Sequence, residues 1–315
     1  MLTLSRLIDD HKCYETVRQL RWPNSVCCLE CGSASFTKRG KHETHPARQR
    51  YVCSDCGRQF DDLIDSLFAG CHQPLQTWIA CLYLMGLNLS NQQMAQELRL
   101  HKDGVHQMAS ELRQAVADKR PEVQLSGTVE FNEVYVTAGH KGHPESVKKK
   151  TAKVGGASSK GYPSGSKLRG RGTLEKEKPP IFGMIQRGGE VVIQMLTNVQ
   201  QKIIQPTVQA TVRAGTLIYT DEYDIYARLE SWGYNHKSVC HSAGEYARDE
   251  DGDGWCEVHI NTMEGFWSLL RSWLRPHRGI SQEKLPIYLG FFEFVHNARK
   301  RGKALLDSLL NTLLC

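Results

Sequence analysis

Two C-x-x-C pairs near the N-terminus constrain the fold of this 315-residue chain more than any other feature. Cys28 and Cys31 form the first pair, Cys53 and Cys56 form the second, and 21 residues separate the pairs. A glycine follows each pair and lets the backbone turn so that its N–H groups point at the sulfurs. Four thiolates suit tetrahedral Zn²⁺, which supplies folding free energy that a segment of about 40 residues lacks. The spacing therefore predicts a structural zinc ribbon, and it favours Cys28 over Cys27 as the first ligand.

Cysteine usage and hydropathy bear on where the protein resides. Eleven cysteines would suggest disulfides in a small secreted protein, but the first residues, MLTLSRLIDDHKCYE, carry acids where a signal peptide is apolar. The longest strongly apolar run, 78–87, is too short to span a bilayer. We therefore expect a reducing, cytoplasmic setting, metal-bound cysteines and no membrane partner.

Positive charge gathers in one segment. The net charge is only +6, but residues 141–178 hold eleven Lys or Arg against three Glu. The stretch 139–178 has too little apolar content to fold alone, and we interpret it as a mobile basic arm. Such one-sided charge favours contact with a nucleic-acid backbone over a solvated linker. The cations expected to make this contact are Lys148, Lys149, Lys150, Arg169 and Arg171.

The region after the cysteines has a helical pattern. Residues 75–87 are apolar enough for a core helix, and Ser90 suits the N-cap of the next one. The apolar spacing that follows is typical of a helix-turn-helix, although a helical hairpin that only packs domains together gives the same spacing. In the first interpretation, the exposed start of the recognition helix meets DNA through Lys102, His106 and Gln107.

From residue 128 the pattern changes to strands and helices. Strands are expected over 128–137, 180–186, 191–196, 216–220 and 236–239, and helices over 201–213 and 226–232. Three antiparallel strands followed by alternating helix and strand describe a ribonuclease H-like α/β sheet. Asp221 directly follows a short buried strand of this sheet, where a carboxylate can reach a cleft.

The segment 259–271 places charged groups along the edge of a helix. Its apolar stripe consists of Ile260, Met263, Trp267 and Leu270. The stripe beside it consists of Asn261, Glu264, Ser268 and Arg271. A carboxylate and a guanidinium so arranged can hold Mg²⁺ and steer a phosphate backbone, or they can be ordinary surface charges.

Taken together, these segments resemble the zinc-ribbon insertion-sequence transposases of the DDE class, over almost the whole chain. The matching segments are Arg-Trp-Pro at 21–23, the C-x-x-C-G-x-x-F ending at Phe60, VEFNEVYV at 129–136, GRG at 170–172, TDEYDIY at 220–226, HINTMEGFW at 259–267 and the aromatic and basic segment 288–301.

The resemblance implies a DNA transposase, a polynucleotidyl transferase that cleaves element ends and transfers the strands to target DNA. Three acidic groups would hold two Mg²⁺ or Mn²⁺ ions. By position, Asp221 is the second acid, Glu264 is the third and Arg271 is the downstream cation that contacts DNA. Asn261 competes with Glu264 as the third ligand, and His259 is a weaker competitor. Double-stranded DNA and further copies of the chain, assembled on paired ends in the bacterial cytosol or nucleoid, are the implied partners.

The first acid departs from the pattern of the family, because Asn132 stands where an Asp is expected. A neutral amide oxygen cannot bring the charge that holds two cations about 4 Å apart. Glu133 should point to the opposite face of the strand, and Glu130 lies about 6.6 Å along it. We therefore expect impaired chemistry. A non-catalytic DNA-binding protein derived from a transposase is the alternative, and an RNA-binding zinc-ribbon protein is a third hypothesis.

These segments predict a multidomain α/β protein. The zinc ribbon with an N-terminal helix covers 1–62, and a helix-turn-helix segment covers 63–124. A ribonuclease H-like mixed-sheet catalytic domain, with the basic insertion and a C-terminal helix, covers 125–315. The acids at 249, 251 and 253 resemble the start of a calcium loop, but its twelfth position is Ile260 rather than Glu, so we interpret them as a solvated loop.

Overall fold

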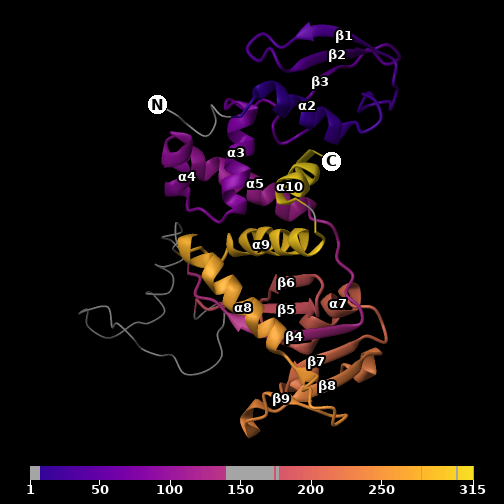
Figure 1. The fold of residues 1–315 in the computed structure, drawn as a ribbon, viewed down its shortest axis with the longest axis vertical. Helices are drawn as coiled ribbons and strands as arrows, with labels where there is room; N and C mark the ends of the chain where they lie inside the picture. The colour runs from indigo at the N-terminus through magenta and orange to yellow at the C-terminus, as the bar shows by residue number, and fades with distance from the viewer. Residues whose placement is uncertain (1–7, 140–173, 175–176, 278, 303, 315) are drawn as a thin grey trace, which may run out of the picture. The chain divides into compact units, whose positions relative to one another are not determined.

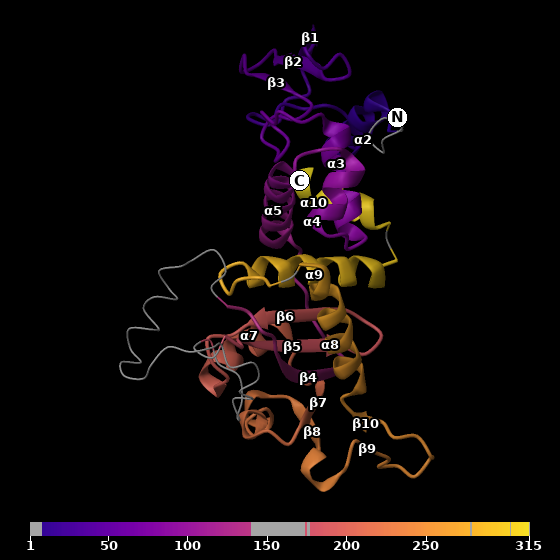
Figure 2. The same cartoon turned by 90° about the vertical axis from the view of Figure 1, so that its left-hand side faces the viewer.

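A computed structural model of the chain describes residues 8–139, 174, 177–277, 279–302 and 304–314. It contains two compact units, drawn in Figures 1 and 2. The first unit combines the residues up to Arg120 with those from Arg301 onward, and the second is Pro121–Lys300.

The last described helix, α10 (Leu305–Leu314), belongs to the first unit. The catalytic domain was expected over 125–315, with its C-terminal helix in the aromatic and basic segment 288–301. That segment, up to Lys300, lies in the second unit, but α10 packs against α2 (Asp10–Arg21), α3 (Leu75–Gly86) and α5 (Lys102–Lys119) of the first unit. Leu309, Leu310 and Leu313 are buried there. An apolar stripe on a terminal helix predicts that the helix is buried, but it does not tell which core receives it.

A small antiparallel sheet follows the first described helix. α2 covers Asp10–Arg21, and the side chain of Asp9 caps its N-terminus by accepting the backbone N–H of His11. The sheet has the order β1-β2-β3. Aromatic side chains, among them Trp22, Tyr51 and Phe60, form its core. Its strands are β1 (Phe36–Lys41), β2 (Gln49–Cys53) and β3 (Gln59–Asp61).

Three helices complete the first unit: α3 (Leu75–Gly86), α4 (Asn91–Leu98) and α5 (Lys102–Lys119). Ser90 caps α4 as expected, in a capping box with Gln93. α4 ends at Leu98, and the left-handed backbone of the next residue, Arg99 (φ 53°), turns the chain sharply into α5. The apolar residues of α4 and α5 face inward as their spacing predicted.

The second unit has the five-stranded sheet order β6-β5-β4-β7-β8. The first three strands of this unit, β4, β5 and β6, pair antiparallel. β7 and β8 extend the sheet in parallel, as expected for a ribonuclease H-like fold. The strands are β4 (Thr128–Tyr135), β5 (Pro180–Gln186), β6 (Val191–Met195), β7 (Leu217–Asp221) and β8 (Asn235–Val239).

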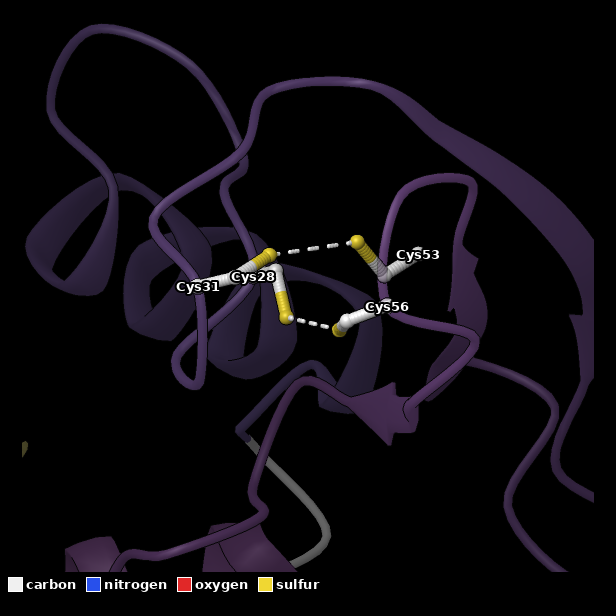
Figure 3. Close-up of side chains that lie close together, drawn as sticks. All are labelled: Cys28, Cys31, Cys53 and Cys56. Atoms are coloured by element: carbon white, nitrogen blue, oxygen red, sulfur yellow. Dashed lines mark hydrogen bonds between the residues drawn. The ribbon is translucent and has the colours of Figure 1, made fainter.

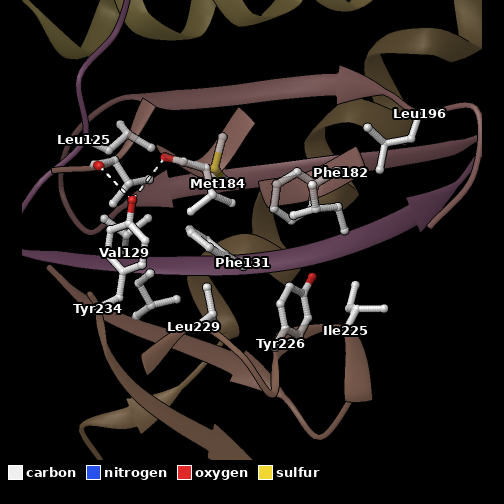
Figure 4. Close-up of a cluster of buried hydrophobic side chains, with 14 residues drawn as sticks. Leu125, Val129, Phe131, Phe182, Met184, Leu196, Ile225, Tyr226, Leu229 and Tyr234 are labelled. Atoms are coloured by element: carbon white, nitrogen blue, oxygen red, sulfur yellow. Dashed lines mark hydrogen bonds between the residues drawn. The ribbon is translucent and has the colours of Figure 1, made fainter. Parts of the chain in front are cut away.

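Helices pack on both faces of this sheet. α7 (Gln201–Thr211) contributes Ile204 and Val208 to a buried cluster on one face, part of which is labelled in Figure 4. α8 (Asn261–Leu274) crosses β4 and β5 on the other face. α9 (Leu285–Lys300) protects the edge strand β6, where Asn297 binds both the N–H and the C=O of Val191.

Short elements connect these parts. The two-stranded ribbon of β9 (Ala247–Arg248) and β10 (Val258–His259) precedes α8. The prediction of an α-helix over 226–232 is wrong, because the chain forms 3₁₀ turns there. Apolar spacing over seven residues does not distinguish an α-helix from 3₁₀ turns. The 3₁₀ turns of this unit are η1 (Asp224–Tyr226), η2 (Glu230–Trp232), η3 (His241–Ala243) and η4 (Arg275–His277).

Candidate active site

Two neighbouring central strands bring Asn132 and Asp221 together. β4 and β7 are parallel, and Glu130 pairs with Tyr219. Continuing that register by two residues sets Asn132 opposite Asp221, the last residue of β7. Neighbouring strands lie about 4.8 Å apart and paired residues project from the same face. Both side chains are partly exposed, and this register directs an amide and a carboxyl group to the same face of the sheet.

α8 covers the same face at very close range. Gly183 of β5 pairs with Asn132, and a Cβ atom at Gly183 would lie 2.2 Å from Cε of Met263 and 2.5 Å from the ring of Trp267. Only glycine permits this approach. A glycine inside a predicted strand indicates that another part of the chain packs closely against it, and this signal was not used in the prediction. The polar residues of the helix remain exposed: Asn261, Glu264 and Arg271.

Glu130 fixes the start of α8 to the sheet. Its fully buried carboxylate accepts the backbone N–H of Met263 at 2.9 Å and the hydroxyl of Thr262 at 2.9 Å. It also forms an ion pair with Arg187, whose Nε lies 2.7 Å away. A carboxylate at a helix N-terminus is further stabilised by the helix dipole. Glu130 is therefore committed to holding α8 and is not available as a metal ligand.

Arg187 connects the β5–β6 turn to the segment that enters α8. It donates to the backbone oxygens of Glu257, at 2.7 Å, and His259, at 2.9 Å, and it stacks 4.4 Å from the centre of the Tyr219 ring. Burial lowers the pKa of His259, so its neutral ring can accept hydrogen bonds from Arg187 and from the N–H of Asn261 at Nδ1. A Glu within a buried strand was the missed signal, because a buried carboxylate requires a cationic or hydrogen-bonding partner.

Glu133 points to the opposite face, as alternation along a strand predicts. Its carboxylate accepts the hydroxyl of Tyr226, which belongs to the buried cluster on the α7 side of the sheet. Burial and, after it, the adjacent carboxylate raise the pKa of Tyr226 well above its usual value. Glu133 therefore cannot replace the missing acid at position 132.

The four predicted cysteines converge at one end of the small sheet (Figure 3). The Sγ atoms of Cys28 and Cys56 are 3.6 Å apart, and those of Cys31 and Cys53 are 3.5 Å apart. A tetrahedral zinc site with Zn–S bonds of about 2.3 Å requires sulfur separations of roughly 3.8 Å. All four sulfurs lie within 4.8 Å of one another, so the donor set fits Zn²⁺.

Glycine turns direct backbone N–H groups at the sulfurs of this cluster. Gly32 and Gly57 follow the two pairs with φ values of 72° and 75°. Hydrogen bonds from the backbone, chiefly that of Cys31, lower the pKa of Cys28 to about 7, and those from Cys56 and Asp55 lower the pKa of Cys53. Desolvation and hydrogen bonds between the thiols, in contrast, raise the pKa of Cys31 and Cys56. A lowered thiol pKa favours the thiolate that a metal binds.

Two models of known protein families match different parts of the chain. Residues 124–297 match the ISXO2-like transposase domain, and residues 8–59 match the transposase zinc-ribbon domain. The chain belongs to the ISXO2-like transposase family.

Relatives of this transposase-family protein occur in distant microbes. An uncharacterized protein in transposable element ISH50 of Halobacterium salinarum is 30% identical over 318 residues, covering all of both chains. An uncharacterized transposase-like protein of Haemophilus influenzae is 25% identical over 34% of this chain and 81% of its own length. The crystal structure of a pre-cleavage Mos1 transpososome covers 70% of this chain and 76% of its own, at 10% identity and a TM-score of 0.19.

The remaining predicted residues of the transposase-family chain fall into three groups. Lys102, His106 and Gln107 are exposed on the first turns of α5, after the short turn from α4. The arm residues Lys148, Lys149, Lys150, Arg169 and Arg171 lie outside the described residues.

The acidic loop forms the third group. Of its three predicted acids, Asp249 and Asp251 lie close to Glu257, which was not predicted, and Asp249 caps its own loop by accepting the backbone N–H groups of Gly252 and Gly254. Within the part of the chain that the structure describes, no helix is long and apolar enough to cross a membrane.

Proposed function

We propose that this chain is a DNA transposase that cleaves the ends of its element and joins them to target DNA, with Mg²⁺ or Mn²⁺ as cofactor. One observation carries the proposal: the parallel register of β4 and β7, in which Glu130 pairs with Tyr219, directs Asn132 and Asp221, each two residues further on, to the same face of the sheet. With an Asp at position 132, two carboxylates would stand side by side on adjacent strands. That arrangement is suited to holding two cations for in-line attack on a phosphodiester.

Asn132 limits this chemistry in the chain as it stands. Asn and Asp have nearly the same shape, so the fold is retained, but the amide oxygen is neutral and binds cations more weakly. In addition, Oδ1 of Asn132 accepts the N–H of Glu133 at 2.7 Å, which turns it toward the backbone. We therefore infer that the chain cleaves DNA poorly.

Glu264 is the proposed third ligand, and Asn261 is its competitor. Both are exposed and lie in the first turn of α8. Glu264 brings the negative charge that a dication requires, whereas Asn261 brings only an amide oxygen. Arg271, two turns after Glu264 on the same side of the helix, is the proposed contact to the DNA backbone.

The proposed partner is double-stranded DNA. The exposed start of α5, with Lys102, His106 and Gln107, has the position of a recognition helix. The basic arm would add contacts to phosphates, and assembly of several copies would bring two element ends together. A cytoplasmic location is consistent with this proposal, because the thiols of a zinc site remain reduced there.

The decisive experiment measures Mg²⁺-dependent cleavage of a plasmid that carries the terminal repeats of the element. We expect Asn132→Asp to cleave on the order of 100-fold faster than the unaltered chain, or more. The loss of one electrostatic contact to a transition state changes a rate by about this factor. In the Asn132→Asp background, Glu264→Ala should abolish cleavage, and Asn261→Ala should leave most of it.

Two outcomes would change these assignments. Full cleavage activity of the unaltered chain would show that Asn132 serves as a metal ligand. Loss of cleavage with Asn261→Ala but not with Glu264→Ala would reverse the assignment of the third ligand.

Asn132 also supports a second candidate function, a DNA-binding protein derived from a transposase that no longer cuts. This alternative predicts that the chain and Asn132→Asp bind the repeats equally well and that neither cleaves them. Binding alone cannot separate the two functions, so cleavage by Asn132→Asp decides between them.

A further inference from the structure

One strand of the zinc ribbon presents exposed cations that form no ion pair with an acid of the described residues. β1 is the edge strand of its sheet, and from Thr37 onward each of its residues is exposed. Its sequence, Phe-Thr-Lys-Arg-Gly-Lys, contains no acid. We call Lys38, Arg39, Lys41 and the neighbouring Arg50 of β2 the ribbon patch.

Most ribbon acids are already paired with other arginines. Asp62 pairs with Arg18 at 3.2 Å, and Asp61 pairs with Arg48 at 2.7 Å. Arg58 forms ion pairs with both Glu30 and Asp65.

The remaining acids do not reach the ribbon patch either. Asp55 accepts the hydroxyl of Ser33, and Glu43 lies beyond the end of β1. Within the described residues, no ion pair involves a member of the ribbon patch. Its charge is therefore left for a partner or for solvent.

The register of the sheet distributes this charge over both faces of the edge strand, with Lys38 and Lys41 on one face and Arg39 on the other. Lys38 pairs with Tyr51 and Lys41 pairs with Gln49, so that Arg39 and Gly40 together lie opposite Arg50. This β-bulge sets two arginines across from each other, where like charges are destabilising, and Asp61, opposite Arg50 on the third strand, offsets only part of that repulsion. An anionic partner would relieve the repulsion.

The bulge is a fixed feature of the ribbon. Gly40 has a φ of 76°, which favours glycine, and its carbonyl accepts a hydrogen bond from the side chain of Gln49 at 2.7 Å. The backbone N–H of Gln49 in turn donates to buried Asp62 at 2.7 Å. The cations therefore extend from a rigid base, which lowers the entropic cost of binding.

We infer that the ribbon patch binds the phosphate backbone of duplex DNA, an inference that rests on the proposed DNA-binding function. An exposed strand edge adds N–H donors to the side-chain cations, and both groups contact phosphates without reading bases. The zinc ribbon would thus add sequence-independent affinity, while sequence is read elsewhere.

The test is the salt dependence of binding of the full chain to a mixed-sequence 40-base-pair duplex, which requires no knowledge of the element ends. The patch variant carries Lys38→Gln, Arg39→Gln and Lys41→Gln. The control variant carries Lys202→Gln, Arg213→Gln and Lys284→Gln, which remove the same charge from exposed positions elsewhere.

The patch variant should reduce the slope of log Kd against log salt by up to about 2.7, because each phosphate contact contributes roughly 0.9. Its affinity near 0.1 M salt should fall by on the order of 100-fold, and the control variant should change less than about threefold. Zinc content verifies folding, and the single Arg39→Glu variant provides a second test should the triple variant lose zinc.

Three outcomes overturn the inference in distinguishable ways. If the patch variant matches the control while Lys102→Gln lowers the slope, the ribbon patch is not a contact and DNA binding still stands. If the unaltered chain shows no salt-dependent binding, the proposed function fails together with the inference. If the patch variant loses affinity only for an RNA stem-loop, the partner of the ribbon patch is RNA.

Discussion

Three neighbouring positions on β4 show how differently similar side chains act at the residue scale. Glu130 holds α8, Asn132 faces the proposed catalytic site, and Glu133 binds Tyr226 on the other side of the sheet. Alternation along the strand predicted the opposite direction of Glu133. It could not predict the role of Glu130, because its partner Arg187 lies 57 residues away in the chain. Contacts over such separations depend on the tertiary fold.

Removing the charge of Glu130 should destabilise the second unit. Glu130→Gln preserves the volume but turns one acceptor into a donor, next to the N–H of Met263 and the guanidinium of Arg187. Breaking a buried charge pair with its hydrogen bonds costs about 2–4 kcal/mol in the free energy of unfolding. Chemical denaturation measures this cost, with the exposed Glu122→Gln as a control that should stay within about 0.5 kcal/mol. Equal stabilities of the two variants would refute the role assigned to Glu130.

At the element scale, the strands of the five-stranded sheet and the helices α7 and α8 were predictable from local pattern. β5 was expected over the residues that it occupies, and β7 and α8 begin or end within a few residues of their expected bounds. The close contact between α8 and β5 was not predicted, because it depends on the absence of a side chain at Gly183. Periodicity reports which face of a helix is buried and not how near its neighbour lies.

Two glycine substitutions should change stability in opposite directions. Gly183→Ala forces Met263 and Trp267 away from the sheet and should lower the free energy of unfolding by about 1–3 kcal/mol. Gly265→Ala, inside α8 with no atom within 4 Å of the added Cβ, should raise it by about 0.4–1 kcal/mol. Thermal unfolding followed by tryptophan fluorescence compares the two variants. A destabilising Gly265→Ala together with a neutral Gly183→Ala would mean that α8 does not pack as described.

At the scale of the whole molecule, the chain contains two units with separate means of stabilisation. The second unit has a large apolar cluster between its sheet and α7. The ribbon has a core of a few aromatic side chains and two of its cysteines, Cys28 and Cys53. Sequence spacing identified the four zinc ligands because they lie in two short motifs, each of which fixes its own geometry. The division between units was harder to predict, because residues from Arg301 onward return to the first unit.

Zinc removal should therefore unfold only part of the molecule. Without the metal, the ribbon has too small a core to stay folded, so a strong chelator should raise hydrogen exchange across β1, β2 and β3. Exchange in β4, β5 and β7 should stay unchanged, because their hydrophobic cluster does not involve the metal. Mass spectrometry of peptides before and after chelation separates the two regions. Cys56→Ser should reproduce the effect of the chelator and Cys27→Ser should not, since only the first removes a ligand. Equal loss of protection in both units would mean that the second unit depends on the ribbon for its stability.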